Sequence, residues 1–288
     1  MQGGIMFYLL NKPKGVSSFK CINDFAKANK IKKIGHTGTL DPLASGLLLV
    51  ATDDDTKLIP YINDKTKTYI TSIEFGKSTS TYDSEGAITN TSINRLKKSD
   101  INKAIQWLNS QKTQIPPLFS AKKINGARGY DLARKNIDFE LKPQNIEVKN
   151  TKLIDFDEQN QILTVELTVS NGTYIRSLAN DIGLAFNTFS YMKELERTSI
   201  STLQKNMLAN NNFVAIINFT PLLSLQHINV SFNQLIQLKN GLDIEFTIED
   251  GEYLLTCEEF DKCNVLGIIT ANAKKIKPKR LFGSRLPK

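Results

Sequence analysis

The stretch that most constrains this chain is residues 34–48, Ile-Gly-His-Thr-Gly-Thr-Leu-Asp-Pro-Leu-Ala-Ser-Gly-Leu-Leu. Three glycines and several hydroxyl residues surround one carboxylate, and an apolar run follows. Glycine allows positive φ and close approach of a ligand to the backbone, while Pro42 biases Asp41 toward an extended conformation. A shaped loop leading into a buried element is therefore expected. A single acid on such a loop suits a nucleophile or general base, whereas a metal site needs more ligands.

The hydrophobic pattern predicts strands and helices that do not alternate regularly. Strands are expected near residues 7–10, 68–75, 145–156, 161–170, 243–248 and 265–270. Helices are expected after Ser17 or Ser18, after Ser99 and Thr173, and over residues 231–239, and residues 56–62 are expected to form part of a helix. The first helix is expected to carry Phe19, Ile22, Phe25 and Ala26 on one face, and Asn125-Gly126 is typical of a hairpin turn. Such a mixture without regular βαβ units indicates an α+β fold.

The length of 288 residues is sufficient for two domains with buried cores. Asn210-Asn211-Asn212 and Thr220-Pro221 interrupt the pattern of strands and helices. We therefore predict one domain at residues 1–223 and a smaller one at residues 224–288. The second segment contains a short helix and several short strands, so it is expected to be rich in β structure.

The net charge of +8 favours a polyanionic partner. Most of the excess precedes Ser224, since residues 224–288 contain nine Lys or Arg and eight Asp or Glu. The exception is residues 274–288, which include seven basic residues and no acidic one. No apolar run reaches the ~18 residues of a membrane span, and the three cysteines lack metal-ligand spacing. A cytoplasmic protein without disulfides or a membrane anchor is therefore expected.

Residues 34–48 resemble the catalytic motif of the bacterial tRNA pseudouridine-55 synthases, in which the aspartate of Gly-His-Thr-Gly-x-Leu-Asp-Pro attacks the target uridine. Other motifs occur in the family's order and approximate spacing. They are Asn-Lys-Pro-Lys-Gly at 11–15, Lys-Thr-Tyr at 67–69, Thr-Tyr-Asp-Ser-Glu-Gly at 81–86, Gln-Ile-Pro-Pro at 114–117 and Gly-Thr-Tyr-Ile-Arg at 172–176. The resemblance implies an α+β catalytic domain with a mixed or antiparallel sheet, followed by a small β-rich domain similar to the RNA-binding PUA domain.

The resemblance further implies that the chain converts uridine 55 in the T loop of tRNA to pseudouridine, with Asp41 as the nucleophile. A closed pocket favours the protonated form of a carboxyl group, and a cationic neighbour is expected to reverse that effect. By resemblance this neighbour is Arg176. Tyr69 is implied to stack on the target uracil and to take part in proton transfer, and both roles suit a phenol. The reaction involves no redox change, so no cofactor is expected. A catalytic zinc is disfavoured because neither the cysteine spacing nor His227 completes a ligand set.

Uridine has to leave the folded T loop before its reacting atoms become accessible. By resemblance, His36 fills the space that the uridine leaves, while Tyr174 and Leu195 contact the flipped base. Lys12 matches an N-terminal lysine near the site and has an electrostatic or packing role. The chain departs from the family's pattern at residues 188–191 and at Ser201, where glycine or alanine is usual. These departures affect the assignment of Leu195 more than that of the nucleophile.

The expected partner is tRNA, without an obligate protein partner. One alternative is a guide-RNA-dependent pseudouridine synthase, which works within a protein complex, but residues 43–48 resemble the stand-alone bacterial enzymes. Another is a non-catalytic tRNA-binding or tRNA-folding protein of the same fold, in which Asp41 or Arg176 would be lost; both are present. A hydrolase is disfavoured because no second carboxylate or Ser-His pair occurs at recognisable spacing.

Overall fold

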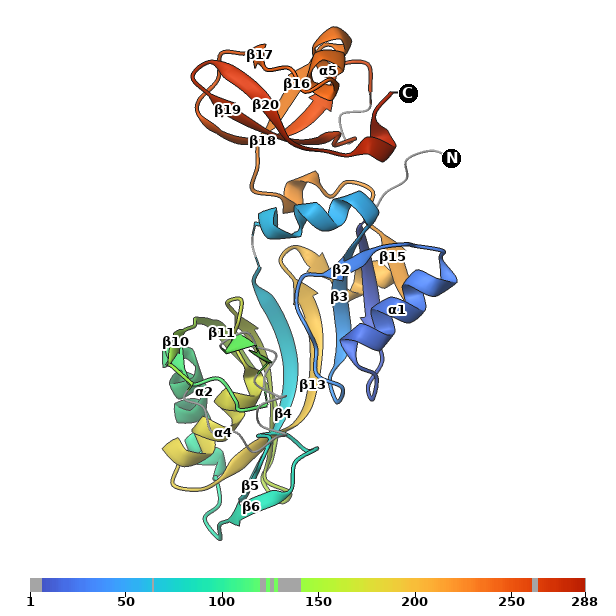
Figure 1. The fold of residues 1–288 in the computed structure, drawn as a ribbon. Helices are drawn as coiled ribbons and strands as arrows, with labels where there is room; N and C mark the ends of the chain where they lie inside the picture. Colours follow the sequence, from blue (N-terminus) through green and yellow to red (C-terminus); the bar gives the residue numbers. More distant parts are fainter. Residues whose placement is uncertain are drawn as a thin grey trace.

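The computed structural model describes residues 7–63, 65–119, 123–124, 127–128, 141–260 and 264–287. Figure 1 shows a large twisted sheet, with a smaller sheet (orange and red) stacked beyond one end of it. The 3₁₀ helix η1 (Asp53–Tyr61) lies between the two sheets. Within the described ranges, no helix is long and apolar enough to cross a membrane.

The large sheet has nine strands, and seven of them follow the order β11-β12-β4-β13-β3-β1-β15. Their bounds are β1 Phe7–Lys12, β3 Ser45–Thr52, β4 Lys67–Phe75, β11 Val148–Asp157, β12 Ile162–Val169, β13 Ser190–Ile200 and β15 Phe213–Ala215. Two short strands complete the sheet: β2 (Ile34–His36) pairs with β3, and β14 (Leu203–Gln204) pairs with β13. The β13–β3 pair is parallel and the other pairs are antiparallel. The prediction of an α+β fold with a mixed sheet is confirmed.

Strand β3 is buried on both faces, as the apolar run in its sequence predicts. Leu48 and Val50 join a core with residues of helices α1 (Ser18–Ala28), α2 (Ile101–Ser110) and α4 (Ile175–Ala185). Leu47 and Leu49 point to the opposite face and join a second core. Because successive side chains of a strand alternate between faces, β3 connects the two cores.

Helix α1 begins where the sequence predicts, since the Ser17 hydroxyl accepts a hydrogen bond from Lys20 N at 3.1 Å. Its buried face differs from the prediction. Ser18, Ile22 and Ala26, spaced by four residues, are buried, whereas Phe19 is 73% exposed. Ser18 takes the inner position because its hydroxyl bonds to the backbone of Leu40, and Phe19 therefore does not share the buried face with Ile22 and Ala26.

The prediction that residues 56–62 form part of a helix is confirmed up to Tyr61, since they belong to η1, a 3₁₀ helix that begins at Asp53. Two other helix predictions need correction at their boundaries. Helix α2 has Asp100 rather than Ser99 at its N-cap, because residues 98–100 form a short 3₁₀ turn, η2 (Lys98–Asp100). Helix α4 has Tyr174 rather than Thr173 at its N-cap, and no side chain caps it.

The predicted strand pair at residues 145–156 and 161–170 is confirmed as β11 and β12. Its first residue, Asn145, instead belongs to β10 (Gln144–Asn145), which pairs with β7 (Thr113–Gln114). The Asn125-Gly126 turn lies outside the described residues, although β8 (Lys123–Ile124) and β9 (Ala127–Arg128) pair on either side of it. Strands β5 (Lys77–Thr79) and β6 (Ile88–Thr91) form a further hairpin.

The smaller sheet has the order β16-β18-β19-β20-β17 and carries helix α5. The bounds are β16 His227–Val230, α5 Phe232–Lys239, β17 Ile244–Glu245, β18 Gly251–Cys257, β19 Gly267–Asn272 and β20 Lys275–Leu281. The strand predicted at residues 243–248 is thus only two residues long, and that predicted at 265–270 begins two residues later. Leu254, Ile268 and Phe282 pack in the same core as Leu58 and Leu222, so the two sheets share apolar contacts.

Candidate active site

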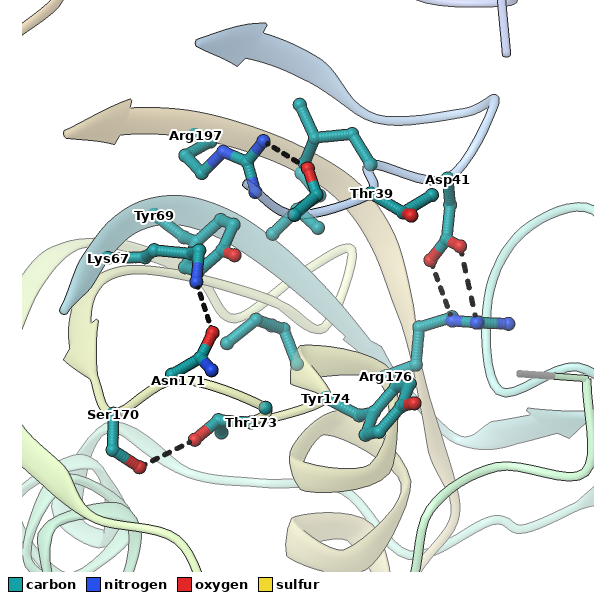
Figure 2. A pocket seen from close by; sticks show the side chains of 15 residues that line it. Thr39, Asp41, Lys67, Tyr69, Ser170, Asn171, Thr173, Tyr174, Arg176 and Arg197 are labelled. Atoms are coloured by element: carbon teal, nitrogen blue, oxygen red, sulfur yellow. Dashed lines mark hydrogen bonds and ion pairs between the residues drawn. The ribbon is translucent and has the colours of Figure 1, made fainter. Parts of the chain in front are cut away.

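A pocket of about 220 Å³ opens between the loop after β2, strand β4 and the N-terminus of α4 (Figure 2). Its lining residues are Gly38, Thr39, Leu40, Asp41, Lys67, Tyr69, Ser170, Asn171, Gly172, Thr173, Tyr174, Ile175, Arg176, Leu195 and Arg197. Five of the seven predicted site residues are among them. The structure therefore brings together Asp41, Tyr69, Tyr174, Arg176 and Leu195, whereas Lys12 and His36 are not in the lining.

The loop that carries Asp41 connects β2 to β3 and is fixed by neighbouring backbone and side chains. Ser18 Oγ is 2.8 Å from both the N and the O of Leu40, and Gly15 N donates to Pro42 O at 2.7 Å. At the end of the loop, Gly46 has φ +104° and a Cβ there would lie 2.2 Å from Arg197 O. Only glycine fits at this position, because both the conformation and the close approach exclude a side chain.

Asp41 and Arg176 form a two-point ion pair at one end of the pocket (Figure 2). Arg176 Nε lies 3.0 Å from Asp41 Oδ2, and Nη2 lies 3.4 Å from Oδ1. The Arg176 side chain is 7% exposed and that of Asp41 is 35% exposed. The guanidinium is therefore buried behind a carboxylate that still faces the pocket. Arg176 reaches this position because it lies in the first turn of α4.

Burial raises the pKa of the Asp41 carboxyl above its ordinary value, and the neighbouring Asp83 carboxylate adds to the rise. The Arg176 guanidinium and the Lys12 ammonium act in the opposite direction. Because the net direction is upward, the expectation that a cation reverses the effect of burial is not met. One physical reason is that Arg176 also serves a second carboxylate.

Asp83 is that second carboxylate, and it is not among the site residues predicted from the sequence. It is 2% exposed, and its Oδ2 lies 3.3 Å from Arg176 Nη1. Its Oδ1 accepts hydrogen bonds from the Thr81 hydroxyl at 2.5 Å and from Glu85 N at 3.1 Å. Arg176 thus bridges two carboxylates. The motif at residues 81–86 is the sequence signal that could have identified Asp83, because it matches the family's pattern and includes this acid.

Tyr69 and Leu195 reach the pocket from two paired strands. Tyr69 on β4 is 6% exposed and Leu195 on β13 is 8% exposed, and both belong to the main core. Tyr174 lies at the N-cap of α4. Its N donates to Gln114 Oε1 at 2.6 Å, and Gln114 Nε2 donates to its O at 3.2 Å. The Gln-Ile-Pro-Pro motif thus contributes a buried glutamine that holds Tyr174.

Lys12 lies behind the loop rather than in the pocket. It is fully buried, and its Nζ donates to Pro13 O at 2.9 Å, Val16 O at 2.6 Å and Pro42 O at 3.3 Å. Burial lowers the pKa of Lys12 to about 8. His36 ends β2 and is half-buried, and its Nδ1 accepts a hydrogen bond from Gly38 N at 3.2 Å.

Lys67 and Arg197 also line the pocket and are not predicted as site residues from the sequence. Arg197 is 1% exposed and donates to Leu47 O at 2.6 Å and Gly38 O at 3.1 Å. Lys67 is 6% exposed and donates to Asn171 Oδ1 at 2.7 Å. Among the residues that the structure describes, no group of three or more His, Cys, Asp or Glu side chains could hold a metal ion.

The architecture is shared with two solved structures. A Cbf5-Nop10-Gar1 complex superposes with a TM-score of 0.66 at 18% identity, covering 99% of this chain and 88% of the matched one. An H/ACA RNP bound to a substrate RNA containing 2′-deoxyuridine gives a TM-score of 0.62 at 17% identity, covering 98% and 86%. At these identities the likeness shows the fold alone.

Sequence relatives are much closer. The tRNA pseudouridine synthase B of Mycoplasma mobile is 46% identical over 286 residues, which cover 98% of this chain and 96% of that protein. The tRNA pseudouridine synthase B of Mycoplasmopsis pulmonis is 40% identical over 283 residues, covering 98% and 97%. The family described as TruB family pseudouridylate synthase (N terminal domain) matches residues 26–175. The resemblance found in the motifs is confirmed, and the chain belongs to the TruB family of pseudouridylate synthases.

Proposed function

We propose that this chain isomerises uridine 55 in the T loop of tRNA to pseudouridine, with Asp41 as the nucleophile. The observation that carries the proposal is the two-point pair of Asp41 and Arg176 at the wall of the pocket. Family membership supports the reaction type, and the relatives named tRNA pseudouridine synthase B support tRNA as the substrate.

The reaction breaks the bond between uracil N1 and ribose C1′ and forms one between C5 and C1′. C5 loses a proton and N1 gains one, so atoms and electrons balance without a redox partner, and the proposal includes neither a cofactor nor a metal. Asp41 supplies the attacking electron pair, which only its ionised form offers. Arg176 orients the carboxylate by two contacts and favours its charged form, while Asp83 fixes Arg176 from the other side.

The pocket walls suit a single flipped base. A volume of about 220 Å³ is below the ~300–1,000 Å³ of pockets for drug-sized ligands. Tyr69 offers an aromatic face for stacking and a hydroxyl for proton transfer. Tyr174 and Leu195 are proposed to contact the base from the other walls. Because a base in the folded T loop is inaccessible, we propose that His36 fills the space that the flipped uridine leaves.

Lys12 is proposed to act behind the loop. Its bond to Pro42 O holds the residue next to Asp41, and its charge lowers the pKa of that carboxyl. This role is the electrostatic or packing one expected from the sequence, without direct contact to RNA. It is consistent with its full burial.

We assign residues 1–223 to the catalytic domain and residues 224–288 to a PUA-like RNA-binding domain. The five-stranded sheet with its basic strand β20 supports this assignment. Lysine and arginine contacts to phosphates supply much of the affinity of proteins for nucleic acids. The proposal also includes a cytoplasmic location and no obligate protein partner.

The test uses the purified chain and an unmodified tRNA transcript, without guide RNA or other proteins. We expect pseudouridine at position 55 and its absence from tRNA of cells lacking the protein. Asp41→Asn keeps the side-chain volume and removes the charge, so turnover should be lost while the Kd for tRNA stays within about threefold, because phosphate contacts dominate affinity. Activity that requires a guide RNA, binding without reaction, or a product at another site would refute the proposal.

A further inference from the structure

Strand β12 ends shortly before helix α4 begins, and Lys67 lies on β4 beside the end of β12. Val169, the last residue of β12, is the register partner of Lys67 on β4. The chain then turns through residues 170–173, with Gly172 at φ +85°, and α4 begins at Ile175. Backbone pairing between β12 and β4 therefore ends at Val169, before residues 170–176, which line the pocket.

The Lys67 side chain reaches from β4 to the turn at residues 170–173. Its Nζ donates to Asn171 Oδ1 at 2.7 Å and to Lys65 O at 3.2 Å. Figure 2 shows Lys67 and Asn171 pointing toward each other at the end of the pocket away from Asp41. Lys67 is 6% exposed, and burial of an ammonium group costs free energy unless acceptors hydrogen-bond to it. A hydrogen bond from a charged donor is also stronger than a neutral one.

The linked segments carry opposite walls of the pocket. Tyr69 lies two residues after Lys67 on β4, whereas Tyr174 and Arg176 follow the turn that contains Asn171. The turn is anchored on its other side by the β7–β10 pair, since Gln144 Nε2 donates to Gly172 O at 2.8 Å and Gln114 holds Tyr174. The Lys67–Asn171 bond thus connects this anchored turn to the strand of Tyr69.

We propose that Lys67 is a positioning residue for the isomerisation: through Asn171 it sets the distance between Tyr69 and the Tyr174–Arg176 segment, and it does so without contacting RNA. The inference rests on the proposed function, because its readout is pseudouridine formation. A shift of about 1 Å in a catalytic geometry can reduce the rate ~100-fold. Loss of either bonding partner therefore affects the chemical step more than tRNA binding.

The experiment compares Lys67→Met, Asn171→Ala, the double variant and Asn171→Asp. Single-turnover rates are measured at saturating enzyme, together with the Kd for tRNA at several salt concentrations. Asn171 is exposed, so Asn171→Ala tests the proposal even if Lys67→Met fails to fold. Lys149→Met is the matched control: it removes an exposed lysine whose Nζ contacts Thr66 Oγ1 at 3.0 Å, next to the start of β4.

We expect Lys67→Met and Asn171→Ala each to lower the single-turnover rate about 10- to 100-fold, with Kd within about threefold of wild type. The double variant should be no slower than the slower single variant, because both remove the same bond. Asn171→Asp should retain most of the rate, since a carboxylate oxygen also accepts from the ammonium. Lys149→Met should react like wild type.

Three outcomes would overturn the inference while the wild-type protein still forms pseudouridine. They are wild-type rates in both single variants, rate losses that multiply in the double variant, and weaker salt-dependent binding in Lys67→Met but not in Asn171→Ala. The last result would identify Lys67 as a direct phosphate contact. A wild-type protein that forms no pseudouridine would instead contradict the proposed function.

Discussion

Replacement of Arg176 by lysine tests its ion pair with Asp41 at one end of the pocket. The guanidinium makes two contacts to Asp41, at 3.0 and 3.4 Å, and one to Asp83 at 3.3 Å. An ammonium is a point charge and cannot reproduce this fork, so at least one contact to Asp41 is lost. A hydrogen bond to a charged group contributes ~1.5–3 kcal/mol. At ~1.36 kcal/mol per tenfold, the chemical step should slow by about 10- to 160-fold.

The assay is release of tritium from uracil C5 of tRNA under single-turnover conditions with saturating enzyme. Binding of tRNA should change little, because Arg176 is 7% exposed and lies behind Asp41. Arg95→Lys is the matched control, since its guanidinium donates to Glu158 O and Gln159 O on the surface. A rate for Arg176→Lys within about threefold of wild type, or one restored by more tRNA, would refute the pairing.

Three further predictions concern the pKa of the proposed nucleophile, the proposed RNA-binding surface and the contact between the sheets. In the proposed mechanism activity requires ionised Asp41, so it should be lost as the pH falls through the raised pKa of that carboxyl. Asp83→Asn removes an anion and should move the acid limb of the rate profile to lower pH, whereas Lys12→Met removes a cation and should move it to higher pH; shifts of the same sign would contradict the assignment. Replacing Lys275 and Lys277 by glutamine should weaken tRNA binding and lower the slope of log K against log salt by about 0.7–0.9 per lost phosphate contact, with unchanged single-turnover rates at saturation; an unchanged slope would place the RNA elsewhere. Arg285→Met should lower the free energy of unfolding by ~3–5 kcal/mol, because it leaves the buried Asp55 carboxylate without its cation. The difference in unfolding free energy between wild type and variant, measured in urea, should shrink as the pH falls and Asp55 takes up a proton. A difference that does not depend on pH would argue against this cause.

The elements that the sequence predicts well are those in which one local pattern determines the structure. Strand β4 alternates buried and half-buried residues along its whole length, as the alternation in its sequence indicates. Five of the seven site residues that the motifs imply also line one pocket in the structure. Each of these predictions needs only the spacing of residues within a short segment, together with the family's order of motifs.

The predictions that failed depend on partners far away in the sequence. Phe19 is exposed because Ser18 bonds to Leu40, 22 residues later. Asp83 has its functional neighbour 93 residues away, in Arg176. Burial raises the pKa of Asp41 and the Asp83 carboxylate adds to the rise, so the nearest cation alone would predict the direction wrongly. Tertiary contacts of this kind leave no periodic signal in a single sequence.

The contact between the two sheets determines how binding and catalysis can be separated by experiment. Arg285 Nη2 lies 2.6 Å from Asp55 Oδ2, with the two side chains 4% and 0% exposed, and Ser284 Oγ donates to Asp54 at 2.7 Å. Phe282 packs in a core that includes residues from both sheets. Removal of residues 224–288 would therefore expose apolar surface on the catalytic part and leave Asp55 without its cation. Because such a truncation perturbs stability as well as the proposed RNA contacts, substitutions on the exposed face of β20 test the proposed contribution of this sheet to tRNA binding more cleanly.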